Sequence, residues 1–463
     1  MATKKNRRSF LITIVIIAVL AFTKVMLSPL GNLDDLWNYS FSKGISMGYI
    51  PYSDINLIYT PLFFMVFSLP LMISRSYFMY RITSSIFLTV TSLLFGRIVS
   101  RRTNNYWGLI SSCILIVFTD IFTYNGLILL FSIIIYMILC SDISRTKSFV
   151  LGVVGALSIL SRQTTGTFIA LFILMVLLSN KPIYRKVMLY LAGGVSVMIP
   201  FAAYLLFIRS FASFWDYCLF SLLSFGENNG LFLPNSLLFL GIAAAGAVCD
   251  IVLIKKNGLN EYFYHLCLGI CILTIGIPII DMMHLIYAGI WFLFPVIKII
   301  SDVNKDRISD TVLKVIAAIT AVYILVTGIS GLSGTVLDHE HKELKLVPIP
   351  SDIFHDNMEV GRICNEYRDE GKRVIVFSSS SAIFSMMNEE YNAPYDVFNN
   401  GNFGMINPLF YVEEACANAN TVIVIPENYG EENWQNPDGV FEYVDEHMNP
   451  VQRYGVYIWY EHP

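Results

Sequence analysis

The chain has 463 residues, of which 55% are hydrophobic and 14% are charged, and its formal net charge is −4. A soluble protein would carry about 25% charged residues, so the composition excludes a wholly soluble one. The small net charge gives no reason to expect a nucleic-acid partner. Long apolar runs fill residues 1–335, whereas 336–463 are of mixed composition. We therefore predict a polytopic α-helical membrane domain followed by an α/β domain.

The first apolar segment, 10–27, is expected to cross the membrane. It is preceded by four basic residues, Lys4, Lys5, Arg7 and Arg8. Basic residues mark the cytoplasmic end of a span, so this segment should end on the external side. It is too long for a cleaved signal peptide, and no small-residue cleavage site follows it. The residues that come directly after it are therefore expected at the outer face of the membrane.

Ten further segments have the apolarity expected of membrane spans. They lie near 77–99, 106–121, 124–140, 148–162, 164–180, 187–208, 235–254, 262–280, 285–300 and 311–332. With eleven spans and a cytoplasmic N-terminus, the C-terminal domain is extracytoplasmic. The loops that should be cytoplasmic contain the basic residues Arg101, Arg102, Arg145, Lys147, Lys181, Arg185, Lys186, Lys255, Lys256, Lys305 and Arg307. The external loops have few, and this distribution predicts a multi-pass protein of the cell membrane.

One apolar stretch, 58–74, does not fit this series. It contains Pro61 and Pro70, which shorten any helix that it can form. Counting it as a span would also place Arg101 and Arg102 outside. We predict instead a helix that lies in, or dips into, the outer membrane interface. The first external loop then runs over 28–76.

The C-terminal domain is predicted to contain a parallel or mixed sheet. Runs typical of buried strands occur at 374–377 and 421–425, separated by helical patterns, and 451–460 alternates like an edge strand. Cys364 and Cys416 lie in this domain. They could form a disulfide in an oxidising compartment, and the sequence leaves this open.

Two adjacent carboxylates, Asp34 and Asp35, stand near the start of the first external loop. Two like charges in one site raise one of the pKa values, which suits a catalytic base, and such a pair can also bind a divalent metal ion. Alternatively, they cap a helix that starts near Leu36. Asp54 is a second candidate acid or the cap of the interfacial helix. Tyr52 could stack on a sugar or anchor the loop in the interface.

Other polar residues near external span ends could hold a phosphate group. Arg162 and Gln163 lie at a predicted external turn, where an arginine is unusual, and the alternative for Arg162 is snorkelling to the interface. Asp281 and His284 share a helix face. His284 could donate to phosphate, and Asp281 could orient it, hold a metal ion or cap the helix. Further candidates are Arg75, Arg81 and Arg209.

These motifs, in this order, resemble the GT-C superfamily of integral membrane glycosyltransferases, in particular the bacterial branch related to protein mannosyltransferases and aminoarabinose transferases. The first loop contains DDLWNY, GYIPYSD and YTPLFF, and SRQTTG and IPIIDMMH are similar to two later elements of the family. The likeness covers roughly 10–300. Two residues depart from the pattern: Asp35 stands where glutamate is common, and Arg162 stands where lysine is usual.

The resemblance implies a polyprenyl-phosphate-linked sugar donor, inversion at the anomeric carbon, and Asp34 as the catalytic base with Asp35 beside it. We accordingly predict a hexosyl- or pentosyltransferase. Its acceptor would be an extracytoplasmic cell-wall polymer, lipid-linked glycan or protein. Asp34 and Asp35 could bind a divalent metal ion, and the sequence indicates no other cofactor.

Three alternative functions can be compared with these features. A polymerase of lipid-linked glycans would use a lipid-pyrophosphate donor and carry a large external loop late in the membrane domain, whereas the longest loop here comes first. A transporter or flippase would favour paired hydropathy repeats and charges at mid-membrane. The sequence shows no internal repeat, and its candidate charges lie at the external edge. A membrane-anchored binding protein would not need eleven spans.

Overall fold

The computed structural model describes residues 4–31, 33–119, 121–220, 236–258, 261–277, 280–304, 309–378, 381–392, 394–398, 407–427 and 439–463. Contacts within the chain define two units. The first comprises Met1–Ser28, Arg81–Ala203 and Leu231–Gly331, and the second comprises Pro29–Tyr80, Tyr204–Gly230 and Leu332–Pro463. The first external loop and the C-terminal residues thus belong to the same unit. The predicted domain boundary after 335 stays a prediction, and the predicted cytoplasmic residues Lys305 and Arg307 lie outside the described residues.

Helices occupy all eleven segments that the sequence predicts as spans. They are α1 (Lys4–Leu27), α4 (Tyr77–Arg102), α5 (Asn105–Phe118), α6 (Tyr124–Leu139), α7 (Arg145–Ser161), α8 (Gln163–Leu178), α9 (Ile183–Phe207), α12 (Leu237–Asn257), α13 (Glu261–Leu273) with η3 (Thr274–Gly276), α14 (Met282–Val303) and α15 (Asp310–Ser330). Among the described residues, five helices are long and apolar enough to cross a membrane, namely α4, α9, α12, α14 and α15, and shorter apolar helices accompany them. The number of eleven crossings stays a prediction.

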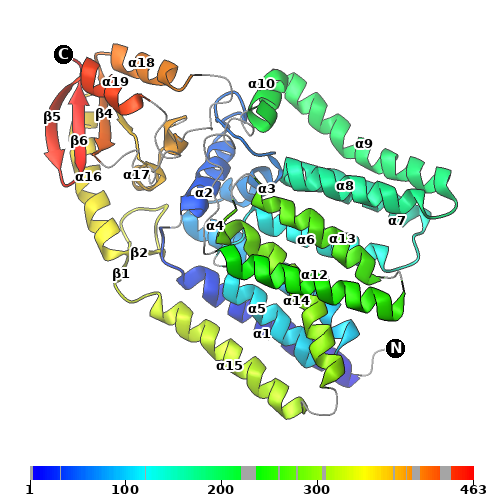
Figure 1. Cartoon of the computed structure of the whole chain (residues 1–463). Helices are drawn as coiled ribbons and strands as arrows, with labels where there is room; N and C mark the ends of the chain where they lie inside the picture. Colours follow the sequence, from blue (N-terminus) through cyan, green and yellow to red (C-terminus); the bar gives the residue numbers. More distant parts are fainter. Residues whose placement is uncertain are drawn as a thin grey trace. The chain divides into compact units, whose positions relative to one another are not determined.

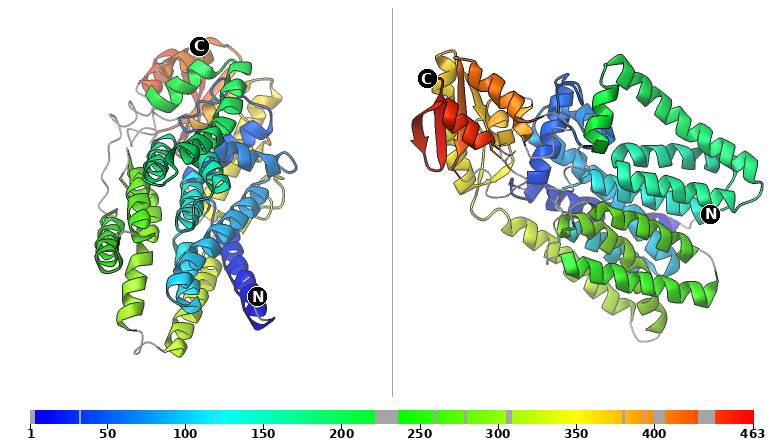
Figure 2. Two further views of the ribbon diagram at one scale, coloured as in Figure 1. Left: turned by 90° about the vertical axis from the view of Figure 1, so that its right-hand side faces the viewer. Right: turned by 45° about the horizontal axis from the view of Figure 1, so that its top comes forward.

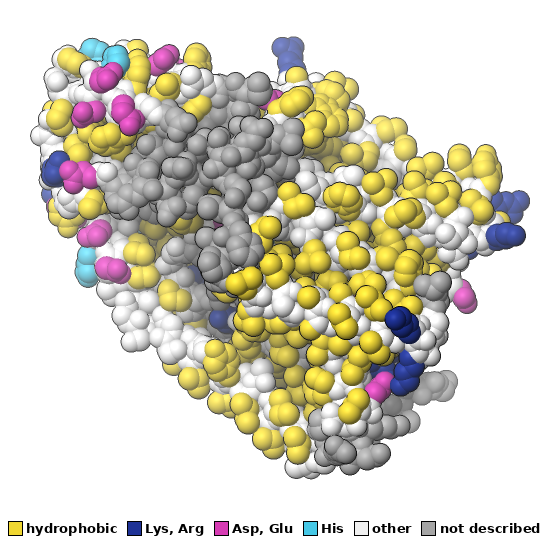
Figure 3. All heavy atoms as spheres, viewed as in Figure 1, with side chains coloured by type: hydrophobic (Ala, Val, Ile, Leu, Met, Phe, Trp, Pro, Cys, Tyr) yellow, Lys and Arg dark blue, Asp and Glu magenta, His cyan; other side chains and the backbone are white. Residues whose placement is uncertain are grey.

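The helices of the first unit pack side by side, with α12 against α14, α7 against α8, and α15 against α1 and α5 (Figure 1). Helices α9, α12 and α15 leave most of their apolar side chains exposed; examples are Ile199 at 61%, Leu238 at 64% and Ile319 at 63%. Hydrophobic side chains cover much of the helical surface in Figure 3. So large an apolar surface is compatible with lipid rather than water, as expected of a multi-pass membrane protein.

The second unit begins with α2 (Leu33–Ser46) and α3 (Leu62–Leu71). Helix α3 has ten residues. Its length is therefore about 15 Å, half of the roughly 30 Å of a bilayer's hydrocarbon core. Pro61 precedes this helix and Pro70 lies in its last turn. The segment 58–74 is thus too short to be a span, as predicted, and its location in the membrane interface stays a prediction.

The rest of the second unit is an α/β arrangement. Its elements are α10 (Phe211–Trp215), η1 (Asp216–Phe220), β1 (Thr335–Leu337), β2 (Pro348–Pro350), α16 (Ser351–Asp369), β3 (Arg373–Val376), α17 (Ser381–Met387), η4 (Tyr395–Val397), α18 (Leu409–Ala417), β4 (Thr421–Pro426), α19 (Val440–His447), β5 (Asn449–Tyr454) and β6 (Tyr457–Glu461). Four strands form one sheet in the order β3-β4-β6-β5. Strands β3 and β4 are parallel and the other neighbours are antiparallel, so the prediction of a mixed sheet is confirmed.

The prediction of one edge strand over 451–460 is wrong. The chain reverses within this run, and β5 and β6 form an antiparallel hairpin in which β5 is the edge strand and β6 lies inside the sheet. Gly455 has a φ of 55° at the turn. Glycine adopts this left-handed conformation without the steric cost that other residues bear, which permits the reversal.

Helices cover both faces of the four-stranded sheet (Figure 2). Val374, Val422 and Val424 pack with α16, whereas Ile375, Ile423 and Ile425 pack with α18 and α19, as the two-residue period of a strand requires. Cys364 belongs to the first cluster and Cys416 to the second. Both thiols are free, so the disulfide that the sequence left open does not form.

Helices α7 and α9 of the first unit approach each other through two glycines. A Cβ at Gly152 would lie 1.9 Å from the Tyr190 carbonyl oxygen, and one at Gly193 would lie 2.1 Å from the Phe149 carbonyl oxygen. The neighbouring Gly194 differs, because a Cβ there would lie 3.7 Å from the Gly152 carbonyl oxygen, an ordinary contact distance. Close helix contacts of this kind are common in membrane proteins.

We expect Gly193→Ala to lower the thermal unfolding temperature of the detergent-solubilised protein, because the added methyl group forces the two helices apart at a cost of about 1–3 kcal/mol. Gly194→Ala is the matched control. It should leave the unfolding temperature unchanged or raise it, since alanine is roughly 1 kcal/mol better than glycine inside a helix. Equal unfolding temperatures for the two variants would contradict the close α7–α9 contact.

Candidate active site

The residues proposed from the sequence fall on both units. The second unit carries Asp34, Asp35, Tyr52, Asp54 and Arg75, and the first carries Arg81, Arg162, Gln163, Asp281 and His284.

Asp34 and Asp35 lie in the first turn of α2. The helix starts at Leu33, three residues before the predicted start near Leu36, so the two acids are inside the helix rather than ahead of it as caps. The positive end of the helix dipole favours negative charge in this turn. Asp35 is only 4% exposed, whereas Asp34 is half-buried. Asp34 is therefore the more accessible of the two carboxylates.

The C-terminal residues bind α2 through a buried lysine. The Lys43 ammonium lies 2.6 Å from Glu343 Oε2, and their side chains are 1% and 4% exposed. Lys43 also donates to the carbonyl of Ser385, at 3.2 Å, and to that of Glu390. An ammonium group has three N–H donors, and all three have an acceptor here.

Tyr39 binds the same carboxylate from the preceding turn of α2. Its hydroxyl faces Glu343 Oε2 at 3.2 Å and the carbonyl of Arg75. Burial raises the pKa of the Glu343 carboxyl, and Lys43 and Tyr39 offset only part of that effect. Burial and the neighbouring Glu343 charge raise the pKa of the Tyr39 hydroxyl well above its usual value, which keeps it a donor. The three side chains form one buried network.

Further hydrogen bonds join the first external loop to the C-terminal residues. Before α2, the Leu30 amide donates to the Pro348 carbonyl at 2.7 Å. After α2, the hydroxyl of Tyr49 and the side-chain amide of Asn56 each donate to a carbonyl at 3.3 Å, those of Tyr391 and Val397 respectively. The loop is therefore fixed to the C-terminal part of its unit before, within and after the acid-bearing helix.

The other candidates of the second unit have structural partners. Tyr52 is 2% exposed, has a φ of 67°, and donates its hydroxyl to the Tyr59 carbonyl at 2.8 Å. Asp54 is exposed and accepts from the Ile50 amide at 2.8 Å, which closes a turn. Its predicted alternative as the cap of the interfacial helix is wrong, because α3 starts only at Leu62. Arg75 is exposed.

Arg162 stands between α7 and α8 and is 5% exposed. Its guanidinium donates to Asn125 Oδ1 at 2.7 Å and to the carbonyls of Ile275 and Ile277 at 2.6 and 3.1 Å. It also lies 5.5 Å from the centre of the Tyr124 ring. These contacts tie the turn of the SRQTTG motif to the end of α13 and η3. Gln163 is the first residue of α8.

Asp281 and His284 form a pair at the start of α14. Asp281 is the N-cap and accepts from the His284 amide at 2.8 Å, while its Oδ1 also lies 2.8 Å from Nδ1 of the imidazole. Burial alone would raise the pKa of Asp281, but the hydrogen bonds and charge of His284 and the Met283 amide outweigh it, so the pKa is lowered. The carboxylate thus fixes the ring through Nδ1, which leaves Nε2 for another group.

Arg81 is fully buried near the start of α4. Its NH1 donates to the Met26 carbonyl at 3.1 Å, close to the end of α1. A buried charge in this position links the two helices that flank the first external loop in sequence.

One buried polar pair was not predicted from the sequence. Asp250 of α12 and His265 of α13 are both buried, with Oδ2 and Nδ1 2.7 Å apart. The His265 ring stacks on Trp291 of α14 at 4.6 Å, and the Trp291 indole donates to the His265 carbonyl at 2.9 Å. An aspartate within a predicted span was the available signal, because ionisable residues are costly there. The pair joins three helices.

A divalent ion at Asp34 and Asp35 finds little support in the arrangement of donors. Calcium and magnesium take six or more oxygen ligands, several of them from protein or water. Within the described residues, no three His, Cys, Asp or Glu side chains come together as a candidate metal site. Adjacent helical positions also point about 100° apart. The described residues thus form no cage of protein ligands, and a metal ion bound by Asp34 and Asp35 together with substrate phosphate and water stays a prediction.

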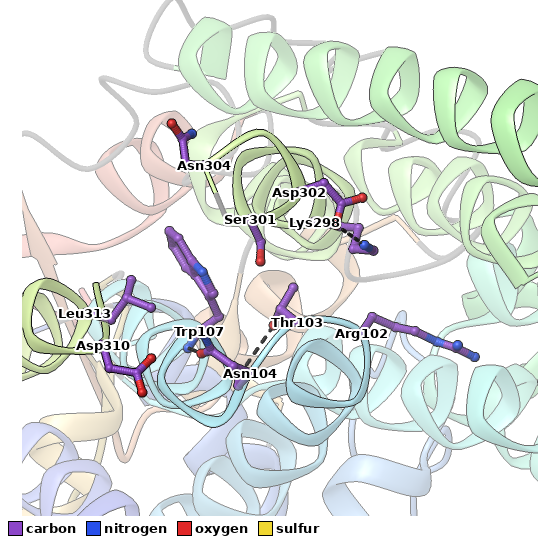
Figure 4. Close-up of a pocket in the computed structure, with 10 residues that line it drawn as sticks. All are labelled: Arg102, Thr103, Asn104, Trp107, Lys298, Ser301, Asp302, Asn304, Asp310 and Leu313. Carbon is purple, nitrogen blue, oxygen red and sulfur yellow. Dashed lines mark hydrogen bonds and ion pairs between the residues drawn. The ribbon is translucent and has the colours of Figure 1, made fainter. Parts of the chain in front are cut away.

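A cavity of about 380 Å³ lies among α4, α5, α14 and α15 (Figure 4). Its lining residues are Arg102, Thr103, Asn104, Trp107, Lys298, Ser301, Asp302, Asn304, Asp310 and Leu313. Its two cations are already paired, Arg102 with Glu261 and Lys298 with Asp302. Its lining includes no candidate residue from the sequence, and the predicted topology places it at the cytoplasmic ends of these helices.

No protein-family model and no curated protein match this sequence. The fold is nevertheless similar to two crystal structures of ArnT from Cupriavidus metallidurans, one in the apo state and one bound to undecaprenyl phosphate. In both comparisons the TM-score is 0.62 and the match covers 97% of each chain, at 9% and 10% identity respectively. The likeness at this identity shows that the chain has the fold of ArnT, an aminoarabinose transferase of the kind that the sequence motifs resemble.

Proposed function

We propose that this protein is a membrane glycosyltransferase that moves a sugar from a polyprenyl-phosphate-linked donor to an extracytoplasmic acceptor. The observation that carries the proposal is the pair of carboxylates in the first turn of α2, directly after α1, in a chain with the fold of ArnT. One ArnT structure contains undecaprenyl phosphate, which supports a polyprenyl-phosphate donor. The acceptor is a cell-wall polymer, a lipid-linked glycan or a protein.

The proposed reaction is a single displacement at the anomeric carbon. The acceptor oxygen attacks this carbon while its proton passes to the Asp34 carboxylate, and the bond from carbon to the phosphate oxygen breaks. The polyprenyl phosphate leaves as an anion, and the configuration of the sugar is inverted. Asp34 is the better base because it is half-buried and can meet an acceptor, whereas Asp35 is 4% exposed. The charge of Asp35 favours proton uptake by its neighbour.

We propose that the donor phosphate is held by polar residues at the predicted external ends of the spans. Arg162 and His284 are the cationic or hydrogen-bonding groups, with Gln163 beside the first and Asp281 fixing the second. Such groups stabilise the charge that develops on the leaving phosphate. Arg81 and Arg75 are further candidates, and Tyr52 and Asp54 are proposed to shape the sugar site.

We propose the cell membrane as the location, with a cytoplasmic N-terminus and an extracytoplasmic C-terminal region. Basic residues concentrated in alternate loops support this orientation. The sugar donor would then be reached from the bilayer and the acceptor from outside the cell.

The first test is a transfer assay with purified protein in proteoliposomes, using a panel of radiolabelled polyprenyl-phosphate sugars and envelope extracts as acceptors. We expect Asp34→Asn to lower kcat at least 100-fold, because general-base catalysis contributes about 10²–10⁴-fold. Asp35→Asn should lower kcat less. Asp352→Asn is a matched control, since it also removes a carboxylate from the first turn of a helix, that of α16.

Two results of this assay would count against the proposal. Full activity of Asp34→Asn in an active preparation would remove Asp34 from the chemistry. Turnover of lipid-pyrophosphate-linked glycans but of no polyprenyl-phosphate sugar would favour the polymerase alternative.

A second test concerns donor binding. Asp281→Asn keeps a residue that caps helices well but removes the carboxylate that holds His284. We expect the KM for the sugar donor to rise about tenfold, as the loss of roughly 1.4 kcal/mol of binding would produce, with a smaller change in kcat. The unfolding temperature should stay near that of the wild type. Ser309→Ala, which removes the N-cap of α15, should leave the donor KM unchanged.

An unchanged donor KM in Asp281→Asn would remove the Asp281–His284 pair from the donor site. An unfolding temperature that drops with the KM effect would instead assign the pair to the stability of α14.

A further inference from the structure

Within its unit, the acid-bearing helix α2 packs against α3, and the C-terminal residues bind it through hydrogen bonds and an ion pair. Bonds at Leu30, Lys43 and Asn56 hold the loop before, within and after the helix. Lys43 differs from the other two because its partner is a carboxylate and its charge is fully buried. A buried charge tolerates little displacement, since any movement leaves it without the acceptors that compensate for lost water.

Lys43 lies on the same helix as Asp34, so its position can affect that of the Asp34 carboxylate. It follows Asp34 by nine residues in the same 14-residue helix, which corresponds to about 13 Å along the axis. A helix of this length moves as a rigid rod, so a shift at Lys43 is carried to the first turn. Misplacing a catalytic group by about 1 Å can cost roughly 100-fold in rate.

We propose that Lys43 is a positioning residue. Through Glu343 and the carbonyls of Ser385 and Glu390, the C-terminal region holds α2 in the orientation that catalysis needs at the acid turn, the first turn of α2 with Asp34 and Asp35. This inference rests on the proposed function, since it takes Asp34 as the base. The C-terminal residues then position α2 within the unit that they share with the first external loop. They are then not an independent acceptor-binding domain whose removal would leave the acid turn intact.

The experiment compares three variants of the full-length protein with the wild type. Lys43→Met removes the charge and leaves Glu343 buried without it. The double variant Lys43→Met/Glu343→Leu removes both charges and replaces them with apolar groups of similar volume, a change that buried ion pairs often tolerate without loss of stability. Val444→Ala is the control: it is a buried residue of α19 on the sheet face packed by α18, and it lowers stability without touching Lys43.

Three quantities are measured for each variant: the unfolding temperature, hydrogen–deuterium exchange of α2 peptides, and kcat and donor KM per folded molecule. In Lys43→Met we expect amide exchange in α2 to rise at least tenfold and kcat to fall about 100-fold, with the donor KM within threefold of the wild type. In the double variant the unfolding temperature should recover, while kcat stays low. Val444→Ala should unfold earlier but keep wild-type α2 exchange and kcat.

Two results would overturn the inference. If the double variant regained both stability and kcat, the ion pair would matter only for folding. If α2 exchanged no faster in Lys43→Met than in Val444→Ala, Lys43 would not fix the helix. The exchange measurement needs no sugar donor, so it separates this inference from the proposed function. A fully active Asp34→Asn with α2 loosened in Lys43→Met would refute the base and retain the role of Lys43 in holding α2.

Discussion

The buried ion pair between Lys43 and Glu343 constrains the whole second unit. Taking two charges out of water costs several kcal/mol for each ion, and only close and fully hydrogen-bonded partners offset that cost. Lys43 meets this condition because all three of its N–H donors reach acceptors, one at Glu343, between β1 and β2, and two in and just after α17. The segment around Glu343, α17 and α2 must therefore be in place together. The position of the first turn of α2 therefore depends on contacts with residues about three hundred positions later in the chain.

A different constraint acts on the first unit, namely the absence of water in the lipid that surrounds its helices. Backbone N–H and C=O groups in lipid must form hydrogen bonds within the protein, which favours helices throughout. Where a helix breaks, its last carbonyl groups lack partners within the helix and need other donors. Arg162 meets such a demand where α13 gives way to η3, because its guanidinium binds the Ile275 and Ile277 carbonyls. Among the described residues, its Nε is buried and has no hydrogen-bond partner. The contacts that the structure shows for this arginine therefore stabilise the fold, and its role in phosphate binding stays a proposal.

Elements that local sequence patterns indicate could be predicted for this protein. Apolar runs located the eleven helical segments and the buried strands β3 and β4, whereas the orientation expected from the basic loops stays a prediction. Local turn chemistry was predictable only in part: the reversal at Gly455 was missed because alternation continues on both sides of it. The start of α2 was placed three residues late, since its acids suit a cap as well as a first turn. Asp250 and His265 were missed because fifteen residues and a helix break separate them.

The sequence by itself determined that the protein is a helical membrane protein with a mixed α/β region, and that an acid pair follows the first helix, because hydrophobicity, charge and residue order are local properties. Only the tertiary structure decided that the first external loop and the C-terminal residues form one unit, that Asp34 is more accessible than Asp35, and that Lys43 meets Glu343. These facts depend on which distant residues become neighbours. Burial and ion pairing depend on which distant residues the fold brings together. The identity of one residue of a pair does not tell which partner it will meet.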